Sequence, residues 1–237
     1  MQKLFWIAAT MGTVVVHAYS AGFQNAKISP YVAQLRSSAN DPMICQGILI
    51  DPNIALFTQS CAELYDEADK VVIGASRING GLDDGEWNKV LSKAYSPNRA
   101  LDFALVQLAR QSNYTPVQIL WDDVAPGKVV WLRGWLPFNS DKSLNRLEET
   151  TVQVITNDQC QAKLKRPMYD FEVCGDNDGI DSCSSYISGS LITEIGGRDF
   201  LVGTMSDYQC VHKPVYQIFN RLSAFRPFIE PILCGGK

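Results

Sequence analysis

Short stretches in which hydrophobic and polar residues alternate, or in which β-branched residues gather, recur along the chain. Such stretches predict β-strands, because successive side chains of a strand point to opposite faces of a sheet. Turn-forming sequences rich in Gly, Pro, Asn and Asp separate them, for example at residues 51–53, 126–127 and 196–197. Examples of the predicted strands are residues 31–36, 44–50, 70–73, 103–108, 128–132, 151–155, 200–205 and 215–219.

Two short helices are predicted among these strands. An Asn or Asp cap at Asn157 or Asp158 indicates one helix over residues 159–164. A second helix begins at Ser223, and Pro227 and Pro231 limit its regularity. The chain shows no internal repeat, and strands spaced by about 8–12 residues are typical of an all-β protein.

The first twenty residues have the pattern of a signal peptide. Lys3 precedes an apolar run over residues 4–16, which is too short to span a bilayer, and small residues follow at Ala18 and Ser20. We therefore expect residues 1–20 to be removed during export and residues 21–237 to form the mature domain.

Composition and charge exclude several classes of protein. The chain has 237 residues, of which 46% are hydrophobic and 19% charged, so it can bury a full core and is not disordered throughout. Its formal net charge is −4, and no block of Lys and Arg occurs. Binding to nucleic acid or to an anionic membrane through counterion release is therefore not expected.

The seven cysteines of an exported chain are expected to pair as disulfides, and the odd number leaves at least one over. A zinc site is the competing interpretation, but no Cys-x-x-Cys pair exists and His212 is the single histidine beyond residue 20. We expect no metal and no cofactor. The sequence Asn113-Tyr114-Thr115 is an acceptor site for an N-linked glycan.

Five segments of the chain form a recognisable series: residues 44–50, 55–61 and 101–108, the pair Gly134-Trp135, and residues 181–183 followed by 188–192. In order and spacing they resemble those of chymotrypsin-like (trypsin-type) serine proteases, over about residues 29–233. The resemblance implies an all-β fold of two packed six-stranded antiparallel barrels with a short C-terminal helix. The first barrel would cover about residues 28–120 and the second about residues 121–237.

The same resemblance implies a set of disulfides. The implied pairs are Cys45–Cys61, Cys160–Cys174 and Cys183–Cys210, and Cys234 remains unpaired. Cys234 is then either an exposed or blocked thiol near the end of the chain or a covalent link to a partner or a second copy.

The catalytic positions of the family are changed in this chain. Peptide hydrolysis in this family needs a serine nucleophile activated by a histidine base. Ser60 occupies the histidine position before Cys61, and a hydroxyl cannot take up and return a proton near neutral pH. Ile187 occupies the nucleophile position, with Tyr186 and Ser185 before it. A shift of one residue would make Ser188 the nucleophile, but it would still lack a base.

Other family features are lost or left without their usual context. Residues 22–29 lack the hydrophobic residue followed by glycine with which active proteases begin after cleavage. Asp102 stands at the aspartate position of the triad, where we expect it to bond nearby backbone or Ser60. Asp181 stands at the base of the pocket that binds Lys or Arg, and Tyr208 would narrow that pocket. We expect His212 to lie on a surface loop.

Three features point to a group of inactive relatives: residues 34–39, the missing histidine before Cys61, and residues 210–213 followed by 215–216. In these features the chain resembles the glucanase inhibitor proteins that oomycete plant pathogens secrete. It implies a protein of the host apoplast that binds and inhibits plant endo-β-1,3-glucanases and so suppresses host defence. Tyr186, Tyr208 and Trp87 are candidate interface residues. A non-inhibitory secreted pseudoprotease, such as a decoy or adhesion module, and a residual serine endopeptidase are the alternatives.

Overall fold

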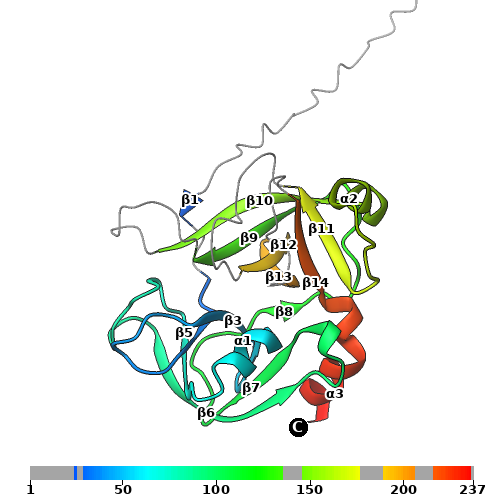
Figure 1. Ribbon diagram of the computed structural model, residues 1–237. Helices are drawn as coiled ribbons and strands as arrows, with labels where there is room; N and C mark the ends of the chain where they lie inside the picture. Colours follow the sequence, from blue (N-terminus) through cyan, green and yellow to red (C-terminus); the bar gives the residue numbers. More distant parts are fainter. Residues whose placement is uncertain (1–23, 26–28, 136–145, 177–188, 206–215, 236–237) are drawn as a thin grey trace, which may run out of the picture.

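The computed structural model describes residues 24–25, 29–135, 146–176, 189–205 and 216–235. Their strands form two antiparallel barrels, one above the other in Figure 1, which confirms the predicted fold class. The first barrel consists of β2 (Val32–Arg36), β3 (Cys45–Asp51), β4 (Ile54–Phe57), β5 (Lys70–Ile73), β6 (Glu86–Tyr95) and β7 (Ala104–Leu108). The second consists of β9 (Val129–Trp135), β10 (Leu147–Ile155), β11 (Glu172–Asp176), β12 (Gly189–Ile195), β13 (Arg198–Met205) and β14 (Tyr216–Arg221).

The first barrel closes in the order β2-β3-β4-β7-β6-β5. Its interior is filled by aliphatic and aromatic side chains that are almost completely buried, such as Leu35, Ile48 and Phe57. The ring of Phe57 needs a glycine opposite it, because a Cβ atom on Gly47 would lie only 2.4 Å from the ring. Hydrophobic burial of this kind is the main force that stabilises a small barrel.

The second barrel closes through the pairing of β9 with β10, in which Trp131 lies opposite Thr151. Val130, Leu132, Val152 and Phe219 belong to its separate core. The predicted turn at residues 196–197 joins β12 to β13, and both of its glycines have the positive φ that side chains disfavour.

Two short strands that precede residue 121 in the sequence pair with strands of the second barrel. Strand β8 (Gln118–Ile119) precedes residue 121 but pairs in parallel with β13 of the second barrel. Strand β1 (Gln24–Asn25) pairs with β10 of the same barrel.

A buried network of charged residues also joins the two barrels. Arg133 of β9 is 1% exposed, and its guanidinium donates to Glu149, to Asp199 and to the hydroxyl of Tyr31 beside β2. Burial raises the pKa of Tyr31 to about 12 and so keeps its hydroxyl protonated. The side-chain amide of Gln46 on β3 donates to the carbonyl of Arg133 over 3.0 Å, so the contact uses backbone as well as side chains.

The helices partly follow the sequence prediction. Helix α2 (Asn157–Leu164) exists, but its cap is Thr156 rather than Asn157 or Asp158. The hydroxyl of Thr156 accepts from the backbone N–H of Gln159, and the Gln159 side chain accepts from the N–H of Thr156. With this reciprocal capping box the helix starts at Asn157, two residues before the predicted start.

The C-terminal helix belongs to the second half of the sequence but packs on the first barrel (Figure 1). The 3-10 turn η3 (Leu222–Phe225) leads into α3 (Arg226–Gly235), which contains Pro231 as expected. Phe225 and Phe228 lie against Phe103 beside β7. Their ring centroids are 4.9 and 6.2 Å, respectively, from the centroid of the Phe103 ring. Within the described ranges, none of the helices is both long and apolar enough to cross a bilayer.

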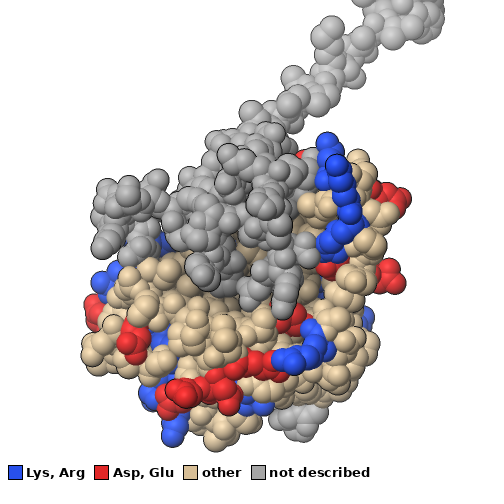
Figure 2. Space-filling view, in the orientation of Figure 1, with Lys and Arg blue, Asp and Glu red and all other residues tan. Residues whose placement is uncertain are grey.

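On the face shown in Figure 2, acidic and basic side chains are interspersed among uncharged residues. Its described part shows no broad basic patch, in keeping with a net charge of −4.

Candidate functional site

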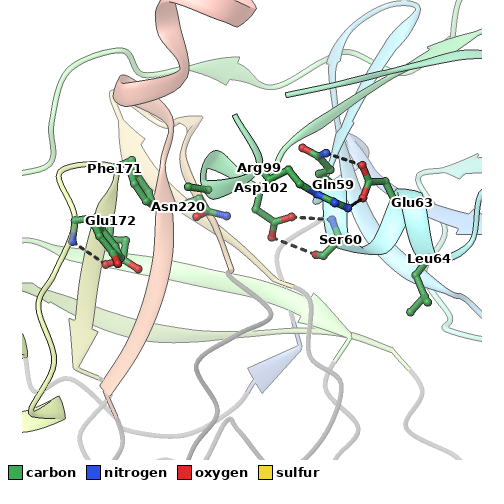
Figure 3. A pocket seen from close by; sticks show the side chains of 11 residues that line it. Gln59, Ser60, Glu63, Leu64, Arg99, Asp102, Phe171, Glu172 and Asn220 are labelled. Carbon is green, nitrogen blue, oxygen red and sulfur yellow. Dashed lines mark hydrogen bonds and ion pairs between the residues drawn. The ribbon is translucent and has the colours of Figure 1, made fainter. Parts of the chain in front are cut away.

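A pocket of about 1020 Å³ lies where side chains of the two barrels face each other (Figure 3). Helix α1 (Gln59–Leu64), which follows β4, and the 3-10 turn η1 (Arg99–Leu101), which precedes β7, form one wall. The segment before β11, β11 itself and β14 form the other. The lining residues are Gln59, Ser60, Glu63, Leu64, Arg99, Ala100, Asp102, Tyr169, Phe171, Glu172 and Asn220.

Ser60 and Asp102, both singled out from the sequence, lie together in this pocket. The backbone N–H of Ser60 donates to Oδ1 of Asp102 over 2.7 Å, and its hydroxyl donates to Oδ2 over 3.2 Å. Ser60 stands second in α1, where the backbone N–H has no partner within the helix. The Asp102 carboxylate therefore completes the start of α1.

Local backbone structure aims the Asp102 carboxylate at the helix. Asp102 adopts the left-handed conformation with φ 43° and ψ 54°, which aspartate tolerates better than most residues. The side chain of Asn98 accepts from the N–H of Ala100 over 3.1 Å and so fixes η1 just before it. The next residue, Phe103, is buried in the core of the first barrel.

Helix α1 is also held by a covalent bond. Cys61 within the helix forms a disulfide with Cys45 at the start of β3. Thr58, the N-cap residue, makes no side-chain capping bond. The position of α1 thus depends on contacts with the rest of the barrel.

Opposite charges meet at the mouth of the pocket. The amide of Gln59 donates to Glu63 over 2.6 Å, and the guanidinium of Arg99 forms an ion pair with the same carboxylate. The hydrogen bond from Gln59 and then the contact with Arg99 lower the pKa of Glu63. Glu63 is therefore ionised and paired at neutral pH.

The second wall combines aromatic rings with a paired carboxylate. The rings of Tyr169 and Phe171 stack with centroids 5.1 Å apart and an angle of 6° between their planes. The Glu172 carboxylate accepts from two guanidinium nitrogens of Arg166, at 3.1 and 2.8 Å, and from the N–H of Tyr169. In β14, Asn220 pairs with Glu172 and so presents its side chain on the same face.

Two buried amides of the pocket have an atom without a hydrogen-bond partner among the described residues. Asn220 is 2% exposed, and its Nδ2 donor has no partner in the described ranges. Gln59 is 5% exposed, and no described residue bonds its Oε1 acceptor. By contrast, Leu64 and Tyr169 stand out at the rim, with 74% and 57% of their surfaces exposed.

The hydrogen bond of Ser60 and the composition of the described lining bear on the chemistry of the pocket. The hydroxyl of Ser60 donates a hydrogen bond to the Asp102 carboxylate, and a hydroxyl cannot serve as the base of acyl transfer. The described lining holds neither an imidazole nor a thiol. Within the described ranges, moreover, no group of three or more metal-binding side chains occurs.

Several residues predicted from the sequence lie outside the described residues. They are Asp181, Cys183, Ser185, Tyr186, Ile187, Ser188, Tyr208, Cys210 and His212.

Other predicted residues are described but do not line the pocket. Trp87 on β6 donates to the carbonyl of Gly81, and the guanidinium of Arg36 lies 5.4 Å from its ring centroid, so Trp87 is part of a local cluster. Asn113 lies exposed on a loop after β7. Cys234 is an exposed free thiol in α3, and Cys160 of α2 is bonded to Cys174 of β11.

Sequence reasoning did not find most of the pocket. Gln59 and Arg99 could have been suspected from their closeness in sequence to Ser60 and Asp102. Tyr169, Phe171 and Asn220 carry no such signal, because only the packing of β11 and β14 against the first barrel brings them to the site.

The sequence was compared with a protein-family model and with known proteins, and the matches agree with the two-barrel fold. The Trypsin family model matches residues 21–229, which is most of the chain. Glucanase inhibitor protein 1 of Phytophthora sojae is 30% identical over 220 residues, covering 86% of this chain and 83% of that protein. Glucanase inhibitor protein 2 of Phytophthora infestans is 28% identical over 232 residues, covering 92% of this chain and 89% of that protein.

The resemblance to glucanase inhibitor proteins expected from the sequence is thereby confirmed. These similarities, together with the two barrels and the Ser60–Asp102 pair in the pocket between them, show that the chain belongs to the trypsin family.

Proposed function

We propose that this protein is a catalytically inactive trypsin homologue that binds and inhibits plant endo-β-1,3-glucanases. The observation that carries the proposal is its similarity, over 86% of the chain, to a protein named as a glucanase inhibitor. Inhibition by binding requires a complementary surface and no chemical step, so it is compatible with a changed catalytic site.

The geometry of Ser60 supports the inactive part of the proposal. Its hydroxyl donates to Asp102, where the proteases of this family place the histidine that activates the nucleophile. With Ile187 at the nucleophile position, both partners of proton transfer would be absent. Asp181 would then be a relic of a substrate pocket, and Tyr208 would narrow it.

The rim of the pocket supplies a surface on which a partner can dock. Leu64 on one wall and Tyr169 on the other are largely exposed, and Arg99 and Glu63 form an ion pair on the same wall as Leu64. Exposed apolar and aromatic side chains around a depression are typical anchors of a protein interface. Tyr186 and Tyr208 are proposed to extend this interface.

Secretion into the plant apoplast is part of the proposal. The predicted signal peptide over residues 1–20 and the two disulfides fit an oxidising compartment. Cys183 and Cys210 would form a third disulfide there. Asn113 is exposed and would carry an N-linked glycan, which digestion with an N-glycosidase would reveal as a shift in mass that Asn113→Gln abolishes.

The direct test is hydrolysis of laminarin by a panel of plant endo-β-1,3-glucanases, with and without the purified, oxidised protein. We expect the rate of at least one enzyme to fall in proportion to the protein added. Unchanged rates across the panel would reject inhibition and leave a non-inhibitory secreted pseudoprotease. Labelling of Ser188 by a fluorophosphonate, with turnover of peptide esters, would reject the inactive assignment.

A matched pair of variants tests whether the interface surrounds the pocket. Leu64→Ser removes an exposed apolar side chain at the rim, whereas Leu91→Ser removes one that is 63% exposed on β6 and does not line the pocket. We expect Leu64→Ser to weaken inhibition and Leu91→Ser to leave it unchanged. Equal inhibition by both variants and the unmodified protein would place the interface elsewhere.

A further inference from the structure

We infer that the pocket between the barrels binds a neutral oligosaccharide. Nothing in the proposed inhibition of an enzyme requires such a ligand, and the inference rests on the side chains of the pocket alone. The observations that carry it are the unpaired amide atoms of Gln59 and Asn220, the pairing of the charged side chains, and the aromatic rings of Tyr169 and Phe171.

The two amides call for a ligand that both donates and accepts hydrogen bonds. Asn220 offers a donor and Gln59 an acceptor, and both side chains line the pocket from opposite walls (Figure 3). A buried polar atom without a partner is destabilising, so the structure tolerates a cost at these two atoms. Because both side chains line the pocket, a polar group that enters it is the natural partner of each atom. A sugar hydroxyl can satisfy either one, since it is both a donor and an acceptor.

The charges of the pocket disfavour an ionic ligand. Glu63 is paired with Arg99, and Glu172 is held by two nitrogens of Arg166. Asp102 accepts two hydrogen bonds from Ser60. The described lining therefore offers an anion no cation without a carboxylate partner, and each described carboxylate already accepts hydrogen bonds. A neutral ligand meets this pocket without separating any of these pairs.

The aromatic side of the pocket suits the apolar face of a sugar ring. Tyr169 is 57% exposed and stacks on Phe171, which is itself packed against the core. This contact holds Tyr169 in one orientation, so little side-chain freedom is lost when a flat ligand packs on it. The volume of about 1020 Å³ is at the upper end of the range found for small-molecule pockets, so it has room for several sugar rings.

The test is calorimetric titration of the full mature protein with laminaripentaose, and with cellopentaose and maltopentaose to compare linkages, in the absence of any enzyme. We expect saturable binding of at least one of them. Asn220→Leu removes the unpaired donor while nearly preserving its volume, so the fold should survive while affinity falls roughly tenfold, the loss expected for one hydrogen bond. Tyr169→Ala should weaken binding by a similar factor. Tyr65→Ala is the matched control, because Tyr65 is 45% exposed and does not line the pocket.

Binding that Asn220→Leu and Tyr169→Ala weaken and Tyr65→Ala leaves intact would support the inference. No binding of any of the three saccharides, or binding that the pocket variants do not alter, would overturn it. Since no glucanase is present, either result leaves the laminarin assay of the proposed function to be decided separately. Glucanase inhibition lost in the pocket variants without any saccharide binding would show that the pocket serves the protein partner instead.

Discussion

Helices α1 and α2 are alike in length and attachment but differ in what holds their first turns. Each is short, and each carries a cysteine bonded to a strand, Cys61 to Cys45 and Cys160 to Cys174. Helix α2 caps itself through Thr156 and Gln159. In α1 the cap residue Thr58 makes no such bond, and Asp102 from a distant turn accepts the N–H of Ser60 instead.

The difference shows which helix is an independent local structure. The first turn of α2 is capped by residues of the helix and its cap position. In α1, the backbone N–H of Ser60 is instead bonded by Asp102 from another part of the barrel. The pocket is built on α1, so the site depends on long-range contacts. The predictions below test this dependence from the largest expected effect to the smallest.

Removing the disulfide of α1 should have the largest effect. Cys45→Ala with Cys61→Ala is expected to lower the free energy of unfolding by about 2–4 kcal/mol, measured by urea denaturation. The pair Cys160→Ala and Cys174→Ala is the matched control, because the two disulfides span 16 and 14 residues. Hydrogen exchange should show α1 opening in the first variant, whereas α2 should keep its first turn in the second. Equal loss of protection in both helices would contradict the comparison.

Removing Asp102 should release the first turn of α1. Asp102→Ala loses both hydrogen bonds to Ser60 and places alanine in a left-handed conformation, so we expect unfolding to become easier by about 1.5–3 kcal/mol. Asp102→Asn keeps an acceptor for the N–H of Ser60 and tolerates the same backbone, so its loss should be smaller. If both variants lose the same free energy of unfolding, the hydrogen bonds from Ser60 of α1 to Asp102 are not the source of the stabilisation.

Removing the cap of α2 should cost less. Thr156→Ala is expected to lower stability by about 1 kcal/mol, because it leaves the N–H of Gln159 without its partner. Thr156→Ser retains the hydroxyl and should restore most of the loss. A serine variant as unstable as the alanine variant would show that the methyl group of Thr156, and not the cap, matters.

The smallest effect should be a change with pH at the end of α1. The folded protein lowers the pKa of Glu63 below its ordinary value of 4.5, chiefly through the hydrogen bond from Gln59. The stabilising contribution is therefore present above pH 4.5 and is lost as the pH falls through the lowered pKa. The difference in unfolding free energy between the unmodified protein and Glu63→Gln should shrink over this range. An NMR titration showing Glu63 to ionise above pH 4.5 would contradict the geometry.

The fold was largely predictable, because strand alternation and the order of the family segments are local signals. Residues 70–73 form β5 as predicted, and most other predicted strands differ only at their ends. Strands β6 and β11 were not among the strands given as examples, and in β6 the mixture of charged and small residues follows no clean alternation. The cap of α2 is Thr156 and neither Asn157 nor Asp158, because Gln159 reaches back to Thr156 and not to an Asn or Asp.

Residues of the site could be predicted only where the neighbouring sequence is itself recognisable. Ser60 and Asp102 were found because each adjoins a recognisable segment. Asn220 is polar within a strand of buried residues, and nothing in its neighbourhood says which face it takes. Its place depends on the register of β14 with β11 and on how the two barrels meet, which are properties of the whole molecule.

The position of α3 has a consequence for how the chain matures during synthesis. Phe225 and Ile229, near the end of the chain, belong to the same core as Phe103 of the first barrel. A nascent chain that has produced β2 to β7 still exposes this part of the barrel's surface. The amino-terminal half therefore has to wait until residues 225–229 have left the ribosome before this part of its surface is covered, and a chain that stopped before them would leave that part exposed.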